Sequence, residues 1–203
     1  MSYADEFKAA FMSSYLDCRS RITGPDWEHV WKFDWNRIMI GNAQPYLDKP
    51  VLRLAAEEMG LKYWDGEPFR FEGAFVRENH RVVGNYRVPI IAVFEHELDI
   101  HGFEQEVIKL AHISCPLKIG ITYSNYWMPT TTEQVRRECE NLIWKWTSDA
   151  FRQLSPYTKE NPESEYVYLM GVDEQPFELS WYHLTFNAGS WPETLRPFEL
   201  LKG

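Results

Sequence analysis

The segment from Arg87 to Leu98 constrains the fold of this chain more than any other stretch. It is a mostly apolar run that ends in two carboxylates, Glu95 and Glu97, and its pattern predicts a buried β-strand. Side chains two residues apart on a strand project from the same face. Two neighbouring carboxylates repel each other and lose hydration when they are buried. A cation, a basic partner or open water must therefore compensate them.

The neighbouring segments predict an α/β fold. Residues 102–113 have the pattern of an amphipathic helix that carries Lys109, and residues 117–123 predict a second apolar strand. Upstream, a helix is expected at 50–59 and strands at 61–64 and 69–76. The order αβββαβ therefore covers residues 50–124 and predicts a mixed central sheet with flanking helices.

Further elements are expected on both sides of this core. They are an N-terminal helix at 3–19, a long helix from 129 to about 154, and strands at 166–172 and 179–187. Residues 22–48, rich in Trp and Pro, show neither a clean helical nor a clean strand period. The length of 203 residues, without repeats or linkers, predicts a single domain spanning 1–203.

Composition excludes several classes of protein. A hydrophobic content of 44% and an aromatic content of 16% argue against disorder. No apolar run reaches the roughly 18 to 20 residues that span a membrane. The three cysteines form no zinc pattern, so buried reduced thiols in the cytoplasm are expected. The net charge of -9 counts against a broad nucleic-acid-binding surface, although a local basic rim can coexist with it.

The order of elements, with acids on the second and third core strands, resembles the PD-(D/E)xK superfamily of restriction-endonuclease-like nucleases. In that family an acid on the second core strand and the acid of the (D/E)xK motif on the third bind a divalent cation, and the lysine activates or orients the attacking water. The resemblance assigns Glu72 and Glu95 as ligands of Mg2+ or Mn2+. Hard cations of this kind prefer carboxylate oxygens.

The sequence departs from the family pattern at two points. It has no Pro-Asp pair, and Glu97 stands where the family has lysine. Lys109, on the helix that follows, occupies the place of a migrated lysine. The resemblance therefore implies a catalytic role for Lys109 and a water-orienting or third-ligand role for Glu97.

The expected function is hydrolysis of nucleic-acid phosphodiesters by a divalent-metal-dependent nuclease, with DNA as the expected substrate and partner. Two alternatives stay open: a catalytically inactive binding module of the same fold, and a metal-dependent hydrolase of a small phosphorylated substrate. A solvated Glu-x-Glu at a strand end is the simplest structural alternative, because acidic residues are mostly exposed. Homodimer formation is also left open.

Overall fold

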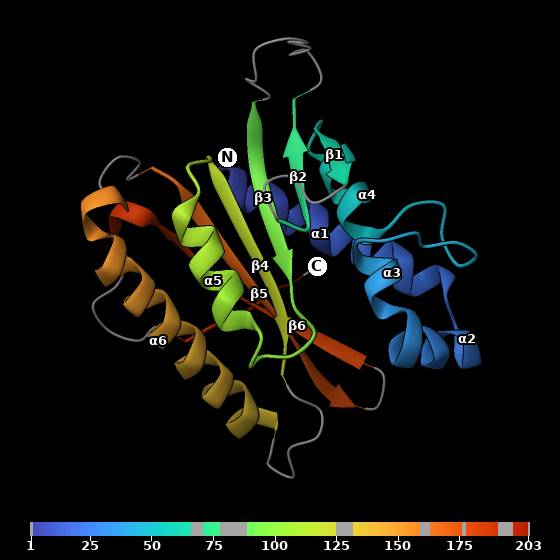
Figure 1. Ribbon diagram of the computed structural model, residues 1–203. Coiled ribbons are helices and arrows are strands. Elements are labelled where there is room, and N and C mark those ends of the chain that lie inside the picture. The colour runs from blue at the N-terminus through green and yellow to red at the C-terminus, as the bar shows by residue number, and fades with distance from the viewer. Residues whose placement is uncertain are drawn as a thin grey trace. The chain divides into compact units, whose positions relative to one another are not determined.

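The computed structural model describes most of the chain in two compact units (Figure 1). The described residues are 2–65, 71–77, 89–124, 132–158, 163–175, 178–190 and 197–202. The first unit comprises Met1–Ile91 with Lys202–Gly203, and the second comprises Ala92–Leu201. This division concerns packing within the chain, so the single-domain assignment stays a prediction.

The first unit is mainly helical, with one antiparallel strand pair. Its elements are α1 (Tyr3–Arg21), α2 (Gly24–His29), the π-helix η1 (Val30–Asp34), α3 (Trp35–Met39), α4 (Val51–Glu58), β1 (Lys62–Asp65) and β2 (Gly73–Val76). Helix α1 begins at an N-cap, because the Ser2 side chain accepts a hydrogen bond from the Asp5 backbone N–H at 3.1 Å. Helix α1 packs against α4. The predicted helices at 3–19 and 50–59 are confirmed.

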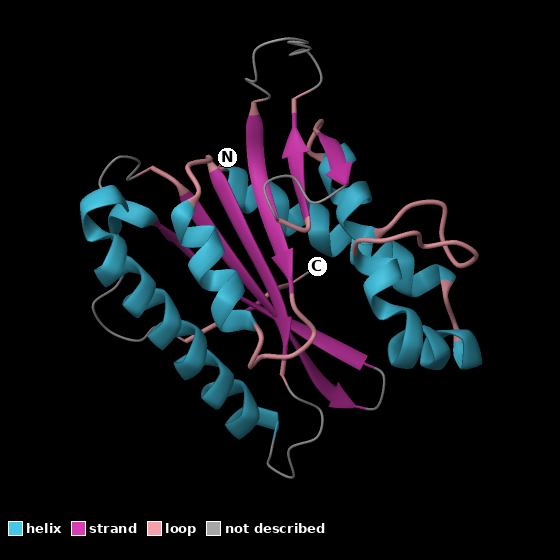
Figure 2. Ribbon diagram, viewed as in Figure 1, coloured by secondary structure: helices cyan, strands magenta, loops and turns pink. Residues whose placement is uncertain are grey.

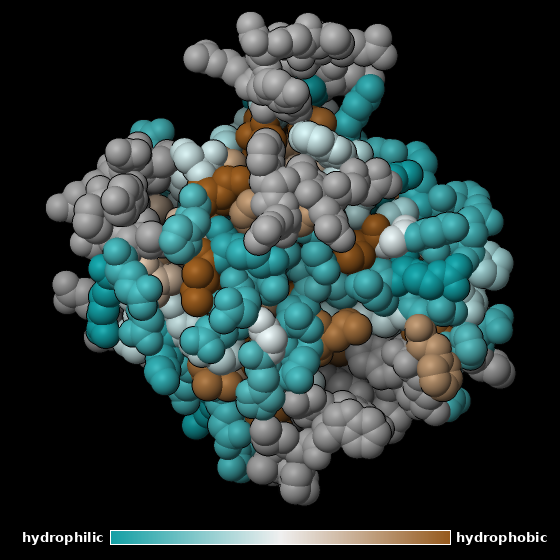
Figure 3. Space-filling view, in the orientation of Figure 1, coloured by the Kyte–Doolittle hydropathy of each residue, from teal (hydrophilic) through white to brown (hydrophobic). Residues whose placement is uncertain are grey.

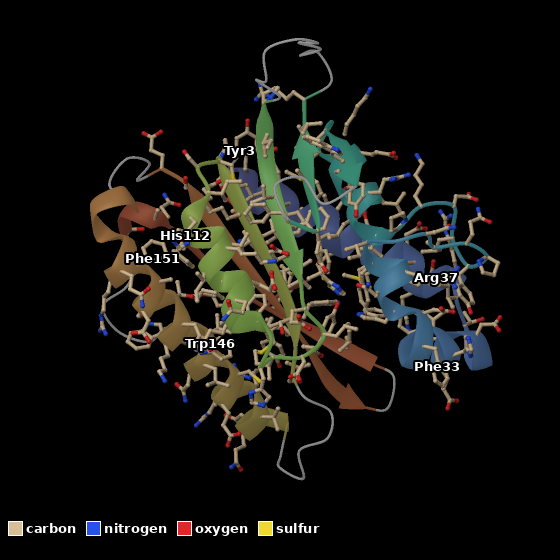
Figure 4. All side chains as sticks on the ribbon, in the orientation of Figure 1. Tyr3, Phe33, Arg37, His112, Trp146 and Phe151 are labelled. Atoms are coloured by element: carbon tan, nitrogen blue, oxygen red, sulfur yellow. The ribbon has the colours of Figure 1, made fainter. Side chains whose placement is uncertain are left out.

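Residues 24–39 are helical, although the spacing of their hydrophobic residues shows no regular helical period. The π-helical turn η1 interrupts the α-helical spacing, which explains the missing 3.6-residue repeat. Edge-to-face packing of Trp27 on Trp35, with ring centroids 5.7 Å apart, holds the two ends of this stretch together. Phe33 is exposed and points away from the helices (Figure 4).

The second unit is a mixed sheet with two helices on one face (Figures 1 and 2). Its elements are β3 (Ile90–His96), α5 (Phe103–His112), β4 (Leu117–Tyr123), α6 (Thr132–Thr158), β5 (Glu165–Gln175), β6 (Glu178–Asn187), the 3-10 turn η3 (Ala188–Ser190) and β7 (Glu199–Leu200). Strands β3, β4 and β5 run parallel, whereas β6 and β7 are added antiparallel. Parallel neighbours need crossover connections, and α5 and α6 supply them.

The α/β class and the element order predicted for residues 50–124 are confirmed, with seven strands in all among the described residues. The strand predicted at 69–76 is shorter than expected, because β2 begins at Gly73 and residues 66–70 lie outside the described range. The restriction-endonuclease-like topology of the sheet stays a prediction. In the described part of the chain, no helix is long and apolar enough to cross a membrane.

Helix α6 turns its aromatic side chains inward. Trp146 and Phe151 are buried on the side of the helix that faces α5 and the sheet (Figure 4). The ring of Phe151 lies 5.4 Å from that of Tyr166 on β5. Hydrophilic residues dominate the outer surface over this helix (Figure 3). The amphipathic pattern of the sequence therefore fixes which face of α6 meets the sheet.

Gly120 in the middle of β4 allows α5 to approach the sheet closely. A Cβ atom at this position would lie 2.6 Å from Cζ of Phe103 on α5 and 2.8 Å from Cδ1 of Tyr168 on β5. The two rings, whose centroids are 5.9 Å apart, fill the space that a side chain would take. Glycine is required here for packing and not for an unusual backbone angle.

Gly120→Ala is expected to lower the free energy of unfolding by about 1–3 kcal/mol, because one of the two rings must leave its rotamer. Urea unfolding measures the loss. In the double variant Phe103→Leu/Gly120→Ala the clash with Cζ of Phe103 is gone, so the combined loss should be smaller than the sum of the single losses. Additive losses would show that the ring of Phe103 is not the obstacle.

Candidate functional site

Glu95 is a carboxylate buried on the helix-covered face of the second unit. It lies one residue before the end of β3 and is paired in register with Gly120. Gly120 in turn is paired with Tyr168, so these three residues share the face that Phe103 of α5 covers. Only 1% of the Glu95 side chain is exposed. The structural alternative of a solvated strand end therefore does not apply to Glu95.

A lysine from α5 meets this carboxylate. The Lys109 ammonium Nζ lies 2.6 Å from Oε1 of Glu95 and also forms an ion pair with Glu106, three residues earlier on the same helix. The side chains of Glu106 and Lys109 are 16% and 35% exposed, so the cluster opens toward solvent on the α5 side. We call these three residues the ion cluster. It holds two carboxyl groups and one ammonium, so it carries one excess negative charge when both carboxyl groups are ionised.

Burial controls the electrostatics of the ion cluster. The pKa of Glu95 is raised to about 8: desolvation by burial raises it most, Lys109 lowers it, and the neighbouring Glu106 carboxyl group raises it. Burial also disfavours the charge on Lys109, but its hydrogen bonds to Glu106 and Glu95 outweigh this effect and raise the lysine pKa. Oε2 of Glu95 is buried and has no hydrogen-bond partner among the described residues. The cluster can therefore take up further positive charge when Glu95 loses its proton.

The contact between Glu95 and Lys109 was expected from the sequence. Glu72, the other proposed metal ligand, lies half-buried in a bend just before β2 in the first unit. Because Glu95 belongs to the second unit, a shared metal ion between Glu72 and Glu95 stays a prediction. The metal-binding and catalytic roles of these residues stay predictions as well.

Glu97 lies just beyond the end of β3, and its contacts are with the loop that leads to α5. Its Oε1 accepts a hydrogen bond from the Asp99 backbone N–H at 3.1 Å. Its carboxylate packs against Gly102, where a Cβ atom would lie 2.8 Å from Cδ of Glu97. Glu97 thus organises the turn into the helix that carries Lys109. Its proposed role in orienting water is a separate prediction.

His96 points to the opposite face of the sheet, as its position next to Glu95 predicts. It is buried, and its Nε2 lies 2.8 Å from the hydroxyl of Tyr123. Burial lowers the pKa of His96 to about 3, so the imidazole is neutral at physiological pH. The three cysteines are free and buried, as expected.

Sequence reasoning missed a second buried charge, Lys118 on β4. Lys118 is 4% exposed, and its ammonium donates a hydrogen bond to the Tyr166 hydroxyl at 2.7 Å while lying 4.5 Å from the centre of that ring. Burial lowers its pKa to about 8. The signal available in the sequence was a lysine inside an otherwise apolar strand. In the structure Lys118 is paired with Val93 and lies on the same face of the sheet as Glu95.

No group of three or more His, Cys, Asp or Glu side chains that could hold a metal ion occurs within the described ranges. The ion cluster contributes only two carboxylates. Comparison with protein-family models, with curated proteins and with solved structures gave no match. The functional argument therefore depends on the residues of this chain alone.

Replacing Glu95 by Gln should change how stability depends on pH. The carboxyl group holds its proton more tightly in the folded state, with a pKa near 8, than its ordinary value of 4.5 allows. The resulting stabilisation is complete below pH 4.5 and is lost as the pH rises toward 8. Relative to wild type, Glu95→Gln should therefore gain roughly 1–3 kcal/mol between these limits.

Urea unfolding in the presence of a chelator measures this difference, with Glu104→Gln at an exposed position of the same helix as the matched control. Parallel stability curves for wild type and Glu95→Gln between pH 4.5 and 8 would contradict the assignment of a raised pKa to Glu95.

Lys118→Met tests the second buried charge. A lysine whose pKa is lowered from 10.5 to about 8 contributes stability that is present above pH 10.5 and is lost as the pH falls through 8. Wild type should therefore gain roughly 1–3 kcal/mol relative to Lys118→Met between pH 7 and pH 10. Wild type should show no such gain relative to Lys145→Met, a change at an exposed position of α6 that leaves Lys118 in place. If the stabilities of Lys118→Met and Lys145→Met depend on pH in the same way, Lys118 is hydrated in the folded protein.

Proposed function

We propose that this protein is a divalent-metal-dependent nuclease that hydrolyses phosphodiesters of nucleic acid, with DNA as the first substrate to test. One observation carries the proposal: the buried carboxylate of Glu95 at the end of β3 meets Lys109 from the next helix. An acid and a lysine close together, beside an unsatisfied carboxylate oxygen, are the groups that metal-assisted phosphodiester hydrolysis needs. The resemblance of residues 50–124 to the PD-(D/E)xK superfamily supports the same reading.

The residues present fit a hard divalent cation. Glu95 offers an oxygen, Oε2, that is buried and unpaired within the described residues, and the ion cluster carries one excess negative charge once Glu95 is ionised. Mg2+ and Mn2+ take such oxygen ligands and retain several waters. In this proposal Glu95 holds the ion. When bound, the ion would lower the pKa of a coordinated water and stabilise charge that develops on the phosphate.

The chain's own residues would perform the remaining steps. The ammonium of Lys109 would neutralise a phosphate oxygen or hold the attacking water, because it lies next to Glu95 and is one-third exposed. Glu97 would orient water from the loop after β3. The aromatic wall formed by Phe103 and Tyr168 would exclude bulk water from the inner side of Glu95.

A non-catalytic binding module is the second candidate. It is favoured by the same ion cluster, because Lys109 already pairs with both acids without any metal. The net charge of -9 also limits binding to phosphate backbones. If the ion cluster is purely structural, loss of Lys109 should leave ligand binding unchanged. If the protein is an enzyme, the same loss should lower the rate of catalysis.

Cleavage assays separate the two candidates. Wild type with Mg2+ or Mn2+ should cut circular or linear DNA, and Lys109→Ala should reduce the rate about 100-fold because a positioned charge is lost from the transition state. Glu95→Gln should abolish the metal-dependent rate. Lys145→Ala, at an exposed site on α6, should cut like wild type.

Circular dichroism and thermal unfolding of each variant show whether the fold is retained. If wild type cuts neither DNA nor RNA faster than Glu95→Gln with either metal, the enzyme proposal fails and the binding module replaces it.

A further inference from the structure

The ammonium of Lys109 occupies the point at which two buried carboxylates converge. Nζ lies 2.6 Å from Oε1 of Glu95 and also contacts Glu106, so both acids direct an oxygen at one position. A Mg–O distance is about 2.1 Å, which Oε1 of Glu95 could reach by a movement of about 0.5 Å. The position of Nζ therefore marks a place where a small cation would fit.

The burial of the three side chains is graded. Glu95 is 1% exposed, Glu106 is 16% exposed and Lys109 is 35% exposed. The lysine thus enters from the solvent side on a long and flexible side chain, whereas Glu95 is fixed by the sheet. Lys109 can leave toward solvent without any movement of the backbone. Neither acid can follow it as easily, because β3 and the first half of α5 hold them.

A second observation points to a ligand. Oε2 of Glu95 is fully buried and has no hydrogen-bond partner within the described part of the chain. Lys109 is a single positive charge facing two carboxyl groups, so one negative charge remains uncompensated when both are ionised. A divalent ion would balance both acids and would satisfy more of their oxygens.

We propose that Glu95 and Glu106 form the cation site, and that Lys109 occupies it as an internal cation until a divalent metal displaces it. This inference rests on the metal dependence proposed above and adds a ligand and a control step to it. Glu106 takes the place of the third acid that the sequence assigned to Glu97, whose carboxylate is engaged by the loop at Asp99 and Gly102.

Displacement has a functional consequence. With a cation held by Glu95 and Glu106, the Lys109 ammonium would be free of both carboxylates and could turn to an incoming phosphate. Without metal the lysine would remain paired, and the site would attract phosphate weakly. Metal concentration would thereby regulate access to the reactive form.

Direct metal binding tests this proposal without any nucleic acid. Mn2+ is titrated into the full-length protein and binding is followed by calorimetry. Lys109→Met should bind Mn2+ at least about 10-fold more tightly than wild type, because the competing occupant is gone. Glu106→Gln should bind at least about 10-fold more weakly. The matched controls, Lys145→Met and Glu104→Gln, are exposed and should stay within about 2-fold of wild type.

A charge-balanced pair of variants guards against unfolding. Glu106→Gln/Lys109→Met removes one charge of each sign, and it should bind Mn2+ more tightly than Glu106→Gln alone. Unchanged or weaker binding after loss of Lys109 in both backgrounds would overturn the displacement, and unchanged binding in Glu106→Gln would overturn the ligand assignment.

The outcomes also separate this inference from the nuclease proposal. If Mn2+ binding follows the expected order but no DNA or RNA is cut, the inference stands and the nuclease function fails. If no variant binds Mn2+ at millimolar concentration, the cation site is refuted together with the displacement.

Discussion

A carboxylate beneath a helix is the constraint on which the arrangement of the second unit depends. The Glu95 side chain is 1% exposed, and an isolated charge at such a depth would cost several kcal/mol. The helix that covers it must therefore supply a compensating charge at one position and apolar contacts at the others. Helix α5 does both, because Lys109 and Glu106 share one face while Val107 and Leu110 are buried on another.

The parallel strands determine where this compensation can come from. A parallel pair needs a crossover, and the chain that leaves β3 must return over one face of the sheet before it forms β4. The crossover helix therefore passes over the end of the strand that it has just left. An acid near the end of β3 and a lysine in the last turn of α5 are brought together by this path, without any contact between distant parts of the sequence.

Much of this arrangement could be predicted from the sequence, because it is local. The apolar runs of β3 and β4 and the amphipathic period of α5 indicated their types, and the order of elements placed Lys109 near Glu95. Other features depend on tertiary packing. The burial of Lys118 follows from the Tyr166 ring on a strand some fifty residues away, and the helical path at 24–39 is hidden by the π-turn of η1. Glu106 could not be assigned from the sequence, since no local pattern distinguishes a buried acid that pairs with a lysine from a surface acid.

The interface between α5 and α6 is built from small side chains, and this affects how the ion cluster can be perturbed. Ala111 and Ala150 are buried against each other with Ile108 beside them, so the two helices lie close together there. The distance between Nζ of Lys109 and the sheet then depends partly on the size of the α6 side chains that pack against α5. A larger residue at Ala150 would press on α5 as a wedge and shift the ammonium relative to Glu95. Substitutions on α6 can thus change the geometry of the ion cluster while every charged residue in it stays the same.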